Sequence, residues 1–474
     1  MKIYRFQKKF VLVIFGASGD LAKLKLFPAI YSLAKQGRFN KDFYIVGFAR
    51  SKKSQSQFKK EFEKSIKDKF KKEVNNKILK DLVNRVSYFQ GQYKNIEDYK
   101  KLRKYLKELT GSEVTTKLAY FSVPPSAFKD IIQNLGETKK TEKEDIRLII
   151  EKPFGEDTES AKDLLHFIVR YFDEENIYLL DHYLGKAAVQ SILNLRHSNK
   201  LLNMMMKGPE VANIQITASE KIGVTSRAGY FDQVGTIKDM LQSHLLQILG
   251  LITLSIPVSG NHESLQRERT NILSSLKFIE SEKNIVIGQY SSYRKEKDVP
   301  KNSKTDTFCA VRLLIDRESW FNTPIYIRTG KKLKEKLTYV VVELEKFEFQ
   351  TKDEIPNRLI FELHPDERIH IRLVNKYGAT PKHELISPSH SLERQSKTAI
   401  TEHGLLLLDV LRKRRKYFLC FQEIIATWRV TDKIINFMKK KKIKVQKYKD
   451  NSNGPSSHIN IPKQDGFDWL KLNE

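Results

Sequence analysis

Cysteine and long apolar runs are both scarce in this sequence. Only two cysteines occur among the 474 residues, Cys309 and Cys420, far apart and without a Cys-x-x-Cys pair. They can build neither a disulfide framework nor a structural zinc site, which is consistent with a reducing compartment. No apolar run reaches the roughly 18 to 20 residues that a helix needs to span a bilayer. Because the basic N-terminus also lacks a small-residue cleavage site, we expect a cytoplasmic protein with no membrane partner.

Acidic residues are also few, which leaves a large positive charge. Lys and Arg number 85 against 57 Asp and Glu, giving a net charge of +28. The lysines are spread along charged helical stretches such as 58–82, with denser runs at 412–416 and 439–444. Such charge raises the local concentration of any anion, whether sugar phosphate, nucleotide or nucleic acid. The charge does not indicate which of these anions is bound. A solvated lysine-rich surface is the more common reason for such a charge.

The sequence does contain enough apolar residues, 40% of the chain, to build sizeable cores. An apolar run at 10–15 is typical of a buried parallel strand, and it breaks at Gly16-Ala17-Ser18-Gly19 before a helical stretch at 22–35. Strand, glycine turn and helix together predict a dinucleotide-binding opening. The spacing is Gly-x-x-Gly rather than the full fingerprint, so a plain tight turn stays open as an alternative. A second strand, 43–49, ends at Arg50, where an acidic residue would suit NAD and arginine suits the 2′-phosphate of NADP.

Further strand-like runs end in residues that bind ligands in many proteins. The run 117–123 is followed by Pro124, 147–150 by Glu151-Lys152-Pro153, and 177–180 by the stretch 181–186. The last of these offers an imidazole, a phenol and an ammonium group, which are donors suited to a phosphate, and a carboxylate, Asp181, that could orient a histidine from elsewhere in the fold. An ordinary strand end and turn is the alternative for these six residues. Since open α/β sheets bind ligands at the carboxyl edge of their strands, the pattern predicts a site at that edge.

Three of these stretches resemble the signature sequences of the glucose-6-phosphate dehydrogenase family. They are 16–23 (GASGDLAK), 151–155 (EKPFG) and 181–186 (DHYLGK). The similarity continues, in family order and at family-like spacing, through 227–232 (RAGYFD), 239–247 (DMLQSHLLQ), 328–331 (RTGK) and 426–429 (ATWR). It covers nearly the whole chain, so it carries most of the functional prediction.

The resemblance implies an α/β Rossmann-like domain at 1–180, which binds NADP. A larger α+β domain at 181–474, with a mainly antiparallel sheet, would bind substrate and carry the dimer interface. Alternating, β-branched patterns at 214–220, 337–344, 359–364 and 369–374 agree with that sheet. The implied enzyme oxidises glucose 6-phosphate to 6-phosphogluconolactone as a homodimer or homotetramer, the first oxidative step of the pentose phosphate pathway.

The resemblance also implies roles for particular residues. His244 would take the hydroxyl proton while hydride leaves the same carbon, and Asp181 would orient its imidazole. The residues that would bind substrate are Lys152, His182, Tyr183, Lys186, Glu220, Asp239, Lys331 and Lys336. The residues that would bind the cofactor are Gly16, Ser18, Gly19, Leu21, Lys25, Arg50, Tyr93, Pro124, Glu151 and Lys152. Hydride transfer needs no metal, and we expect none.

Most of these residues also have ordinary explanations. A histidine among leucines, as in the helical run 238–251, usually packs in a core, and the charge run 331–336 usually faces solvent. Three departures from the family pattern bear on substrate affinity and oligomer packing rather than on the reaction. One is the basic run 412–416, where the family has a less charged loop. His364 precedes Pro-Asp-Glu where the family has glutamine, and Glu402-His403-Gly404 replaces its Tyr-Glu-Arg.

Two alternatives come from other classes of function. A related NADP-dependent sugar oxidoreductase would share the glycine turn and Glu-Lys-Pro, but should lack the block 181–186. A basic nucleic-acid-binding protein on an inherited enzyme fold would keep the charge of +28 and dispense with the site residues. Because those residues are present, we expect no specific nucleic-acid partner.

Overall fold

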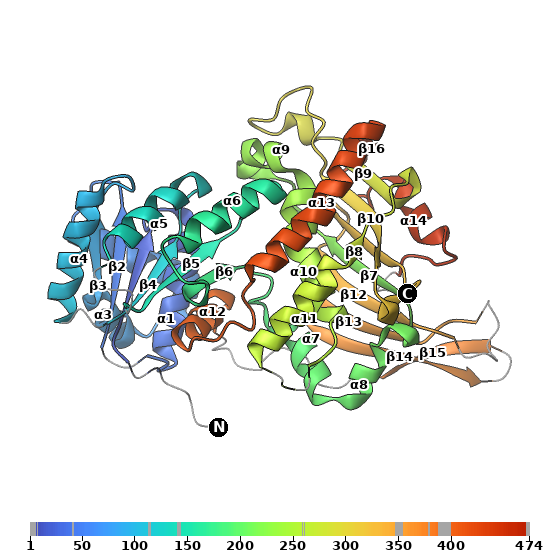
Figure 1. Ribbon diagram of the computed structural model, residues 1–474, viewed down its shortest axis with the longest axis horizontal. Helices are drawn as coiled ribbons and strands as arrows, with labels where there is room; N and C mark the ends of the chain where they lie inside the picture. The colour runs from blue at the N-terminus through green and yellow to red at the C-terminus, as the bar shows by residue number, and fades with distance from the viewer. Residues whose placement is uncertain are drawn as a thin grey trace. The chain divides into compact units, whose positions relative to one another are not determined.

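The chain folds into two units, each with its own sheet (Figure 1). The computed structural model describes residues 6, 8–39, 42–111, 115–139, 144–257, 259, 261–346, 354–377, 380–386 and 400–470. The first unit comprises residues 1–185 and 395–420, and the second comprises 186–394 and 421–474. The predicted division after residue 180 lies near the first of these breaks. It did not anticipate that 395–420 returns to the first unit.

The first unit is built on a six-stranded parallel sheet with strand order β3-β2-β1-β4-β5-β6. Its strands are β1 Phe10–Phe15, β2 Phe43–Ala49, β3 Val86–Gln90, β4 Thr116–Phe121, β5 Ile146–Glu151 and β6 Ile177–Leu180. All six residues of β1 are buried, as its unbroken apolar run predicts for a strand covered on both faces. This strand order is that of the doubly wound dinucleotide-binding fold, which confirms the predicted Rossmann-like domain.

The helices of this unit form two groups by their contacts, α1 to α3 with α12, and α4 to α6. They are the π-helix η1 Ala22–Leu26, α1 Phe27–Lys35, α2 Gln55–Phe70, α3 Asn76–Asn84, α4 Ile96–Thr110, α5 Phe128–Glu137, α6 Thr158–Val169 and α12 Glu402–Leu411. The returning helix α12 packs against α1 and η1. Arg147 on β5 fixes its end by donating to the carbonyls of Val410 (2.6 Å) and Leu411 (2.8 Å). These long-range contacts are the reason that 395–420 belongs to the first unit.

The second unit holds a ten-stranded mixed sheet. Nine strands follow the order β15-β14-β13-β12-β7-β11-β10-β9-β16, and β8 pairs with β10. They are β7 Val211–Ser219, β8 Leu276–Lys277, β9 Ile285–Tyr290, β10 Phe308–Ile315, β11 Ile325–Gly330, β12 Leu337–Leu344, β13 Arg358–His364, β14 Arg368–Tyr377, β15 Thr380–Ile386 and β16 Gln446–Tyr448. Only the pairs β7–β11 and β9–β16 are parallel among these, so the predicted mainly antiparallel sheet is confirmed.

The helices of the second unit include a second π-helix, η7. They are α7 Ala187–Ser198, α8 Lys200–Met205, α9 Ala228–Thr236, η7 Ile237–Leu245, α10 Leu246–Thr253, α11 His262–Ser274, α13 Phe421–Lys441 and α14 Asn460–Lys463. The long helix α13 contacts α11 and η7, and Figure 1 shows it in red beside α10 and α11. None of the helices in the described part of the chain has the length and apolarity that a bilayer crossing requires.

Candidate functional site

The glycine turn after β1 has a conformation that requires glycine at Gly16. Its φ is +82°, and a Cβ there would lie 2.1 Å from the carbonyl oxygen of Ser122. The Gly16 amide donates to Phe48 O (2.8 Å), and the Gly19 amide donates to Gly16 O (2.9 Å). The turn leads directly into η1, which carries Lys25, an exposed side chain. A glycine turn at the end of a buried strand, followed directly by a helix start, is the arrangement that accommodates a pyrophosphate.

Three predicted cofactor residues lie near one another at the carboxyl edge of β1, β2 and β3. The Arg50 guanidinium carbon is 5.4 Å from the centre of the Tyr93 ring, a cation–π contact. Ser18 Oγ lies 3.5 Å from Ser51 Oγ, which places the glycine turn beside the end of β2. The Tyr93 carbonyl is fixed by Tyr99 Oη (3.1 Å) and by a side-chain amide of α5 (2.8 Å). Burial raises the pKa of the Tyr93 phenol, and the charge of Arg50 partly opposes that shift.

Glu151 is the last residue of β5, and Lys152 follows it directly. Tyr120, on the neighbouring strand β4, donates a short hydrogen bond to Glu151 Oε1, and burial beside that carboxylate raises the pKa of Tyr120 well above its usual value. His403 on α12 places Nε2 3.6 Å from the same oxygen. The Lys152-Pro153 peptide is cis. Pro124 comes after β4 as the residue that precedes a short turn of 3-10 helix.

The stretch after β6 forms a tight turn organised by Asp181. This side chain is 1% exposed, and its Oδ1 accepts from the amide of Tyr183 (2.8 Å). The amides of Leu184 and Gly185 donate to the carbonyls of Asp181 (3.1 Å) and His182 (3.2 Å). The rings of His182 and Tyr183 meet edge to face, with centroids 5.0 Å apart. A strand end and turn is therefore what these residues form, and that turn holds the candidate groups in fixed positions.

In the second unit, three predicted substrate residues from different elements meet. Lys331 follows β11 and is 5% exposed. Its ammonium group forms a short ion pair with Glu220, which follows the neighbouring strand β7, and lies 3.8 Å from Asp239 of η7. The charge run 331–336 therefore contains at least one lysine that is buried rather than solvated. Parallel pairing of β7 with β11 explains this meeting, because both strands end at the same edge.

A positive cluster forms around His364 at the end of β13. Burial lowers the pKa of the His364 imidazole, and the charges of Lys336 and Lys186 lower it further. Asp366 and Glu362 act in the opposite direction. Lys186 immediately precedes α7 and Lys336 immediately precedes β12. Two of the lysines predicted to bind a phosphate thus lie near enough to act on one imidazole, which is itself a departure from the family pattern.

His244 lies on η7, whose start is fixed by a carboxylate that sequence reasoning missed. Asp306 accepts from the amide of Ile237 at Oδ2 (3.0 Å), and its carbonyl accepts from the amide of Thr236 (3.0 Å). Complete burial raises the pKa of Asp306 to about 6. Gln242 ties the same helix to Thr427 on α13 (3.1 Å). His244 is 1% exposed.

The missed residues carried weak sequence signals. Asp306 stands in a polar loop, and Tyr120 is one of several aromatic strand residues. His403 was visible only as a departure from a family pattern. The predicted pairing of His244 with Asp181 joins residues of different units, and it stays a prediction.

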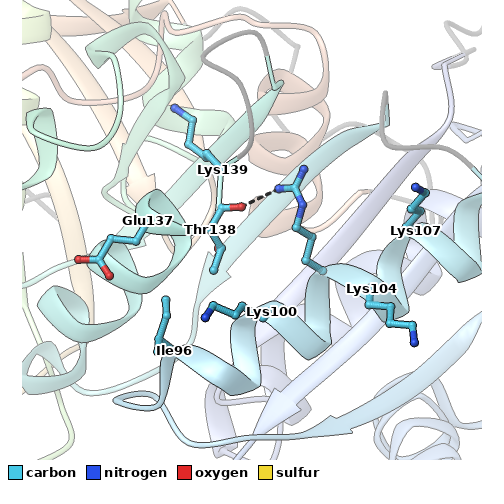
Figure 2. Close-up of a pocket in the computed structure, with 8 residues that line it drawn as sticks. Ile96, Lys100, Lys104, Lys107, Glu137, Thr138 and Lys139 are labelled. Atoms are coloured by element: carbon cyan, nitrogen blue, oxygen red, sulfur yellow. Dashed lines mark hydrogen bonds between the residues drawn. The ribbon is translucent and has the colours of Figure 1, made fainter.

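A separate pocket of about 690 Å³ lies in the first unit between α4 and the end of α5 (Figure 2). It is lined by Ile96, Lys100, Arg103, Lys104, Lys107, Glu137, Thr138 and Lys139. Arg103 donates to the carbonyl of Thr138 (2.8 Å) and pairs with Glu144. Figure 2 shows the ammonium group of Lys104 pointing away from Lys139, so these two cations do not converge on one ligand position. The pocket contains none of the predicted site residues.

Comparison with known proteins matches both parts of the chain to one family. Residues 13–191 match the model described as glucose-6-phosphate dehydrogenase, NAD binding domain, and residues 193–470 match the corresponding C-terminal domain. Glucose-6-phosphate 1-dehydrogenase of Buchnera aphidicola is 34% identical over 486 residues, covering 98% of each chain. Glucose-6-phosphate 1-dehydrogenase 5, cytoplasmic, of Arabidopsis thaliana is 31% identical, covering 96% of this chain and 91% of its own length.

A solved structure is similar over the same extent. It is described as glucose-6-phosphate dehydrogenase in complex with its substrate glucose-6-phosphate, and it superimposes with a TM-score of 0.90. Its sequence is 29% identical, and the match covers 99% of this chain and 100% of the other.

Proposed function

Because the chain belongs to the glucose-6-phosphate dehydrogenase family, we propose that it oxidises glucose 6-phosphate to 6-phosphogluconolactone, with hydride transfer to NADP. This reaction is the first oxidative step of the pentose phosphate pathway. The observation that carries the proposal is the match to both family domains over nearly the whole chain. The contacts among Lys331, Glu220 and Asp239 support it, because they place hydroxyl-binding carboxylates beside a buried cation.

His244 is the proposed base and Asp181 its orienting partner. Removing the hydroxyl proton in step with loss of hydride requires a base that is neutral near physiological pH and held in one orientation. The fixed start of η7 and the tie between Gln242 and Thr427 support such a position for His244. A carboxylate that accepts from the second ring nitrogen would select the productive tautomer and stabilise the cation that forms.

For the substrate phosphate we propose His182, Tyr183, Lys186 and Lys336, with Lys331 also near it. Two of these lysines act on the same imidazole, so their charges are concentrated in one region of the second unit. Glu220 and Asp239 would accept hydrogen bonds from sugar hydroxyls, and Lys152 would address the reacting end. Binding energy from the remote phosphate would then position the carbon that is oxidised.

NADP is the proposed cofactor, and it supplies the hydride acceptor. The glycine turn supports a dinucleotide because it joins β1 directly to a helix start, where backbone amides can face a pyrophosphate. Gly16 itself is required by its φ of +82° and by the close carbonyl of Ser122. Arg50 would pair with the 2′-phosphate. The remaining proposed contacts are Ser18, Gly19, Leu21, Lys25, Tyr93, Pro124, Glu151 and Lys152.

The proposal extends to the organisation of the protein. The first unit would bind NADP, and the second would bind substrate and form the interface of a homodimer or homotetramer. We also propose a cytoplasmic location, which the name of the Arabidopsis relative supports. Light scattering coupled to size exclusion would measure the oligomeric state.

The test is the formation of NADPH from glucose 6-phosphate, followed by absorbance, with NAD and with other sugar phosphates in parallel. We expect turnover with glucose 6-phosphate and NADP to exceed that of the other combinations. Faster turnover of another sugar would favour a related oxidoreductase. If no sugar is oxidised and nucleic acid binds specifically at physiological salt, the enzyme assignment is wrong.

A further inference from the structure

Lys331 is held by its main chain as well as by its side chain, through residues that the proposed function does not use. Its amide donates to Thr307 O (2.9 Å), and its carbonyl accepts from Tyr448 Oη (2.7 Å). Tyr448 lies on β16, 117 residues further along the chain. Its side chain is 4% exposed, and Thr307 is 0% exposed. A lysine proposed to contact substrate is therefore tied at its own main chain to a buried phenol.

The hydroxyl of Tyr448 carries one proton, and its neighbours direct that proton to Lys331 O. The Tyr290 amide on β9 donates to Thr307 Oγ1 (3.0 Å), so this hydroxyl keeps its own proton for Tyr448 Oη (2.9 Å). The other acceptor for the Thr307 proton, Gly288 O, is 3.5 Å away. Tyr448 Oη lies 3.1 Å from Thr307 O, a longer contact than the one with Lys331 O. A chain of hydrogen bonds thus runs from β9 to the main chain of Lys331.

The residues after Tyr448 also support the loop that begins at Lys331. The Asn451 amide donates to Lys332 O (2.7 Å), and the Lys332 amide donates to Ile222 O (3.3 Å). Lys332 has a φ of +55°, a conformation that is uncommon for residues other than glycine. Such a conformation persists only where neighbouring contacts impose it. The main chain next to Lys331 is therefore fixed from outside its own loop.

The position of the Lys331 ammonium group depends on this main chain. The group pairs with Glu220 and lies 3.8 Å from Asp239. It also lies 5.1 Å from the centre of the Phe231 ring. Because these neighbours surround a side chain that is itself buried, a shift of the Lys331 main chain moves the ammonium group relative to both carboxylates. Binding groups tolerate little displacement before affinity falls.

We propose that Tyr448 is a positioning residue for Lys331 and sets the affinity for glucose 6-phosphate through its hydrogen bond to the Lys331 carbonyl. The inference rests on the proposed function, which gives Lys331 its role in substrate binding. Removal of the hydroxyl leaves a buried carbonyl without this donor, which costs free energy unless the loop shifts towards another. The proposed base, His244, is not part of this chain of hydrogen bonds. Loss of the hydroxyl should therefore raise KM more than it lowers kcat, as expected when an interaction common to the ground and transition states is weakened.

The experiment uses the full chain and measures two kinds of constant. KM and kcat come from NADPH formation, and the dissociation constants of glucose 6-phosphate and NADP come from calorimetry. The variants are Tyr448→Phe, Lys331→Met and the two changes combined. The matched control is Tyr339→Phe, which also removes a buried tyrosine hydroxyl that donates to a backbone carbonyl, that of Leu470 (2.8 Å).

The expected result is a selective loss of substrate affinity. Tyr448→Phe should raise the KM and the dissociation constant for glucose 6-phosphate about three- to tenfold, the size expected of one neutral hydrogen bond. The dissociation constant of NADP should change by less than about twofold, and Tyr339→Phe should resemble the parent in every constant. Lys331→Met should weaken the substrate further. Adding Tyr448→Phe to it should then change the substrate constant by less than about twofold, because the hydroxyl acts through a side chain that is no longer there.

Four results would overturn the inference, and they differ in what they remove. If Lys331→Met weakens the substrate while Tyr448→Phe binds it like the parent, the proposed site stands and this inference alone is wrong. Equal weakening of glucose 6-phosphate and NADP in Tyr448→Phe, with a lower melting temperature than in Tyr339→Phe, assigns the tyrosine a structural role only. Fully additive effects of Tyr448→Phe and Lys331→Met show that Tyr448 acts by another route. If Lys331→Met binds glucose 6-phosphate like the parent, Lys331 leaves the proposed substrate site and the inference fails with it.

Discussion

The buried ion pair between Glu423 and Arg269 links the stability of the second unit to the position of His244. Glu423 on α13 is 0% exposed and Arg269 on α11 is 2% exposed. Their bidentate contact has Nε to Oε1 at 2.5 Å and Nη2 to Oε2 at 2.9 Å. One turn further along α13, Thr427 accepts from Gln242 and so holds the π-helix of His244. Loss of the carboxylate should therefore affect both folding and catalysis.

The change Glu423→Ala leaves a buried guanidinium without its counter-ion. Breaking a buried pair in this way costs about 3–5 kcal/mol. For a large domain, each kcal/mol lowers the melting temperature by about 2–4 °C, so we expect a fall on the order of 10 °C. A matched control is Asp316→Ala, which breaks the exposed pair of Asp316 with Lys277 (3.0 Å). That exposed pair is worth less than about 1 kcal/mol.

The first measurement is thermal unfolding. The second is the initial rate of the enzymatic reaction, taken at a temperature at which both variants are folded. The double change Arg269→Met with Glu423→Leu should recover most of the lost stability, because an apolar pair of similar volume carries no desolvation penalty. A Glu423→Ala protein that unfolds within a degree or two of Asp316→Ala would refute the reasoning. So would a double variant no more stable than the single one.

Four further predictions concern the site. His244→Asn should bind both ligands by calorimetry and lose turnover by at least about 10² to 10⁴, and near-normal turnover would sink its assignment. Arg50→Ala should weaken NADP far more than NAD in competition assays, whereas equal losses would give the arginine only a structural role. Lys186→Gln should depress kcat/KM for glucose 6-phosphate far more than for glucose, by more than high salt does in the parent protein. Because the pKa of Asp306 is raised to about 6 in the folded protein, the contribution of Asp306 to stability should be fully present below its unfolded pKa and be lost as the pH rises through about 6; Asp306→Asn should remove about 3 kcal/mol of that dependence in urea unfolding.

The sequence predicted the sheets well because their signals are local. The run at 10–15 is apolar without interruption, and β1 is buried along its whole length. The ends of the strands also placed Arg50, Glu151 and Asp181 at one edge of the first unit, since parallel strands end together. For such residues, position in the chain and position in the fold follow from the same pattern.

Long-range polar contacts could not be predicted from the sequence. Nothing near Arg147 indicates that it anchors a helix from residues 402–411, and nothing near Asp306 indicates that it starts the helix of His244. Such contacts join residues far apart in the chain and carry no periodicity. They also determine where the compact units divide, and the sequence did not indicate that 395–420 packs with the first unit.

The geometry of η7 shows how a correct helix prediction can still miss what matters for a site. The run 238–251 predicted an ordinary helix, in which residues five apart point about 140° away from each other at 3.6 residues per turn. Asp239 and His244 are five apart. In η7 the backbone hydrogen bonds join residues five apart. The Leu246 amide, for example, donates to Leu241 O. Residues five apart then lie roughly one above the other, so the carboxylate paired with Lys331 and the proposed base are presented on one side of the helix. The kink at Gly235, with φ +71°, and the Asp306 carboxylate sit where this winding begins, which gives both a structural reason to be there.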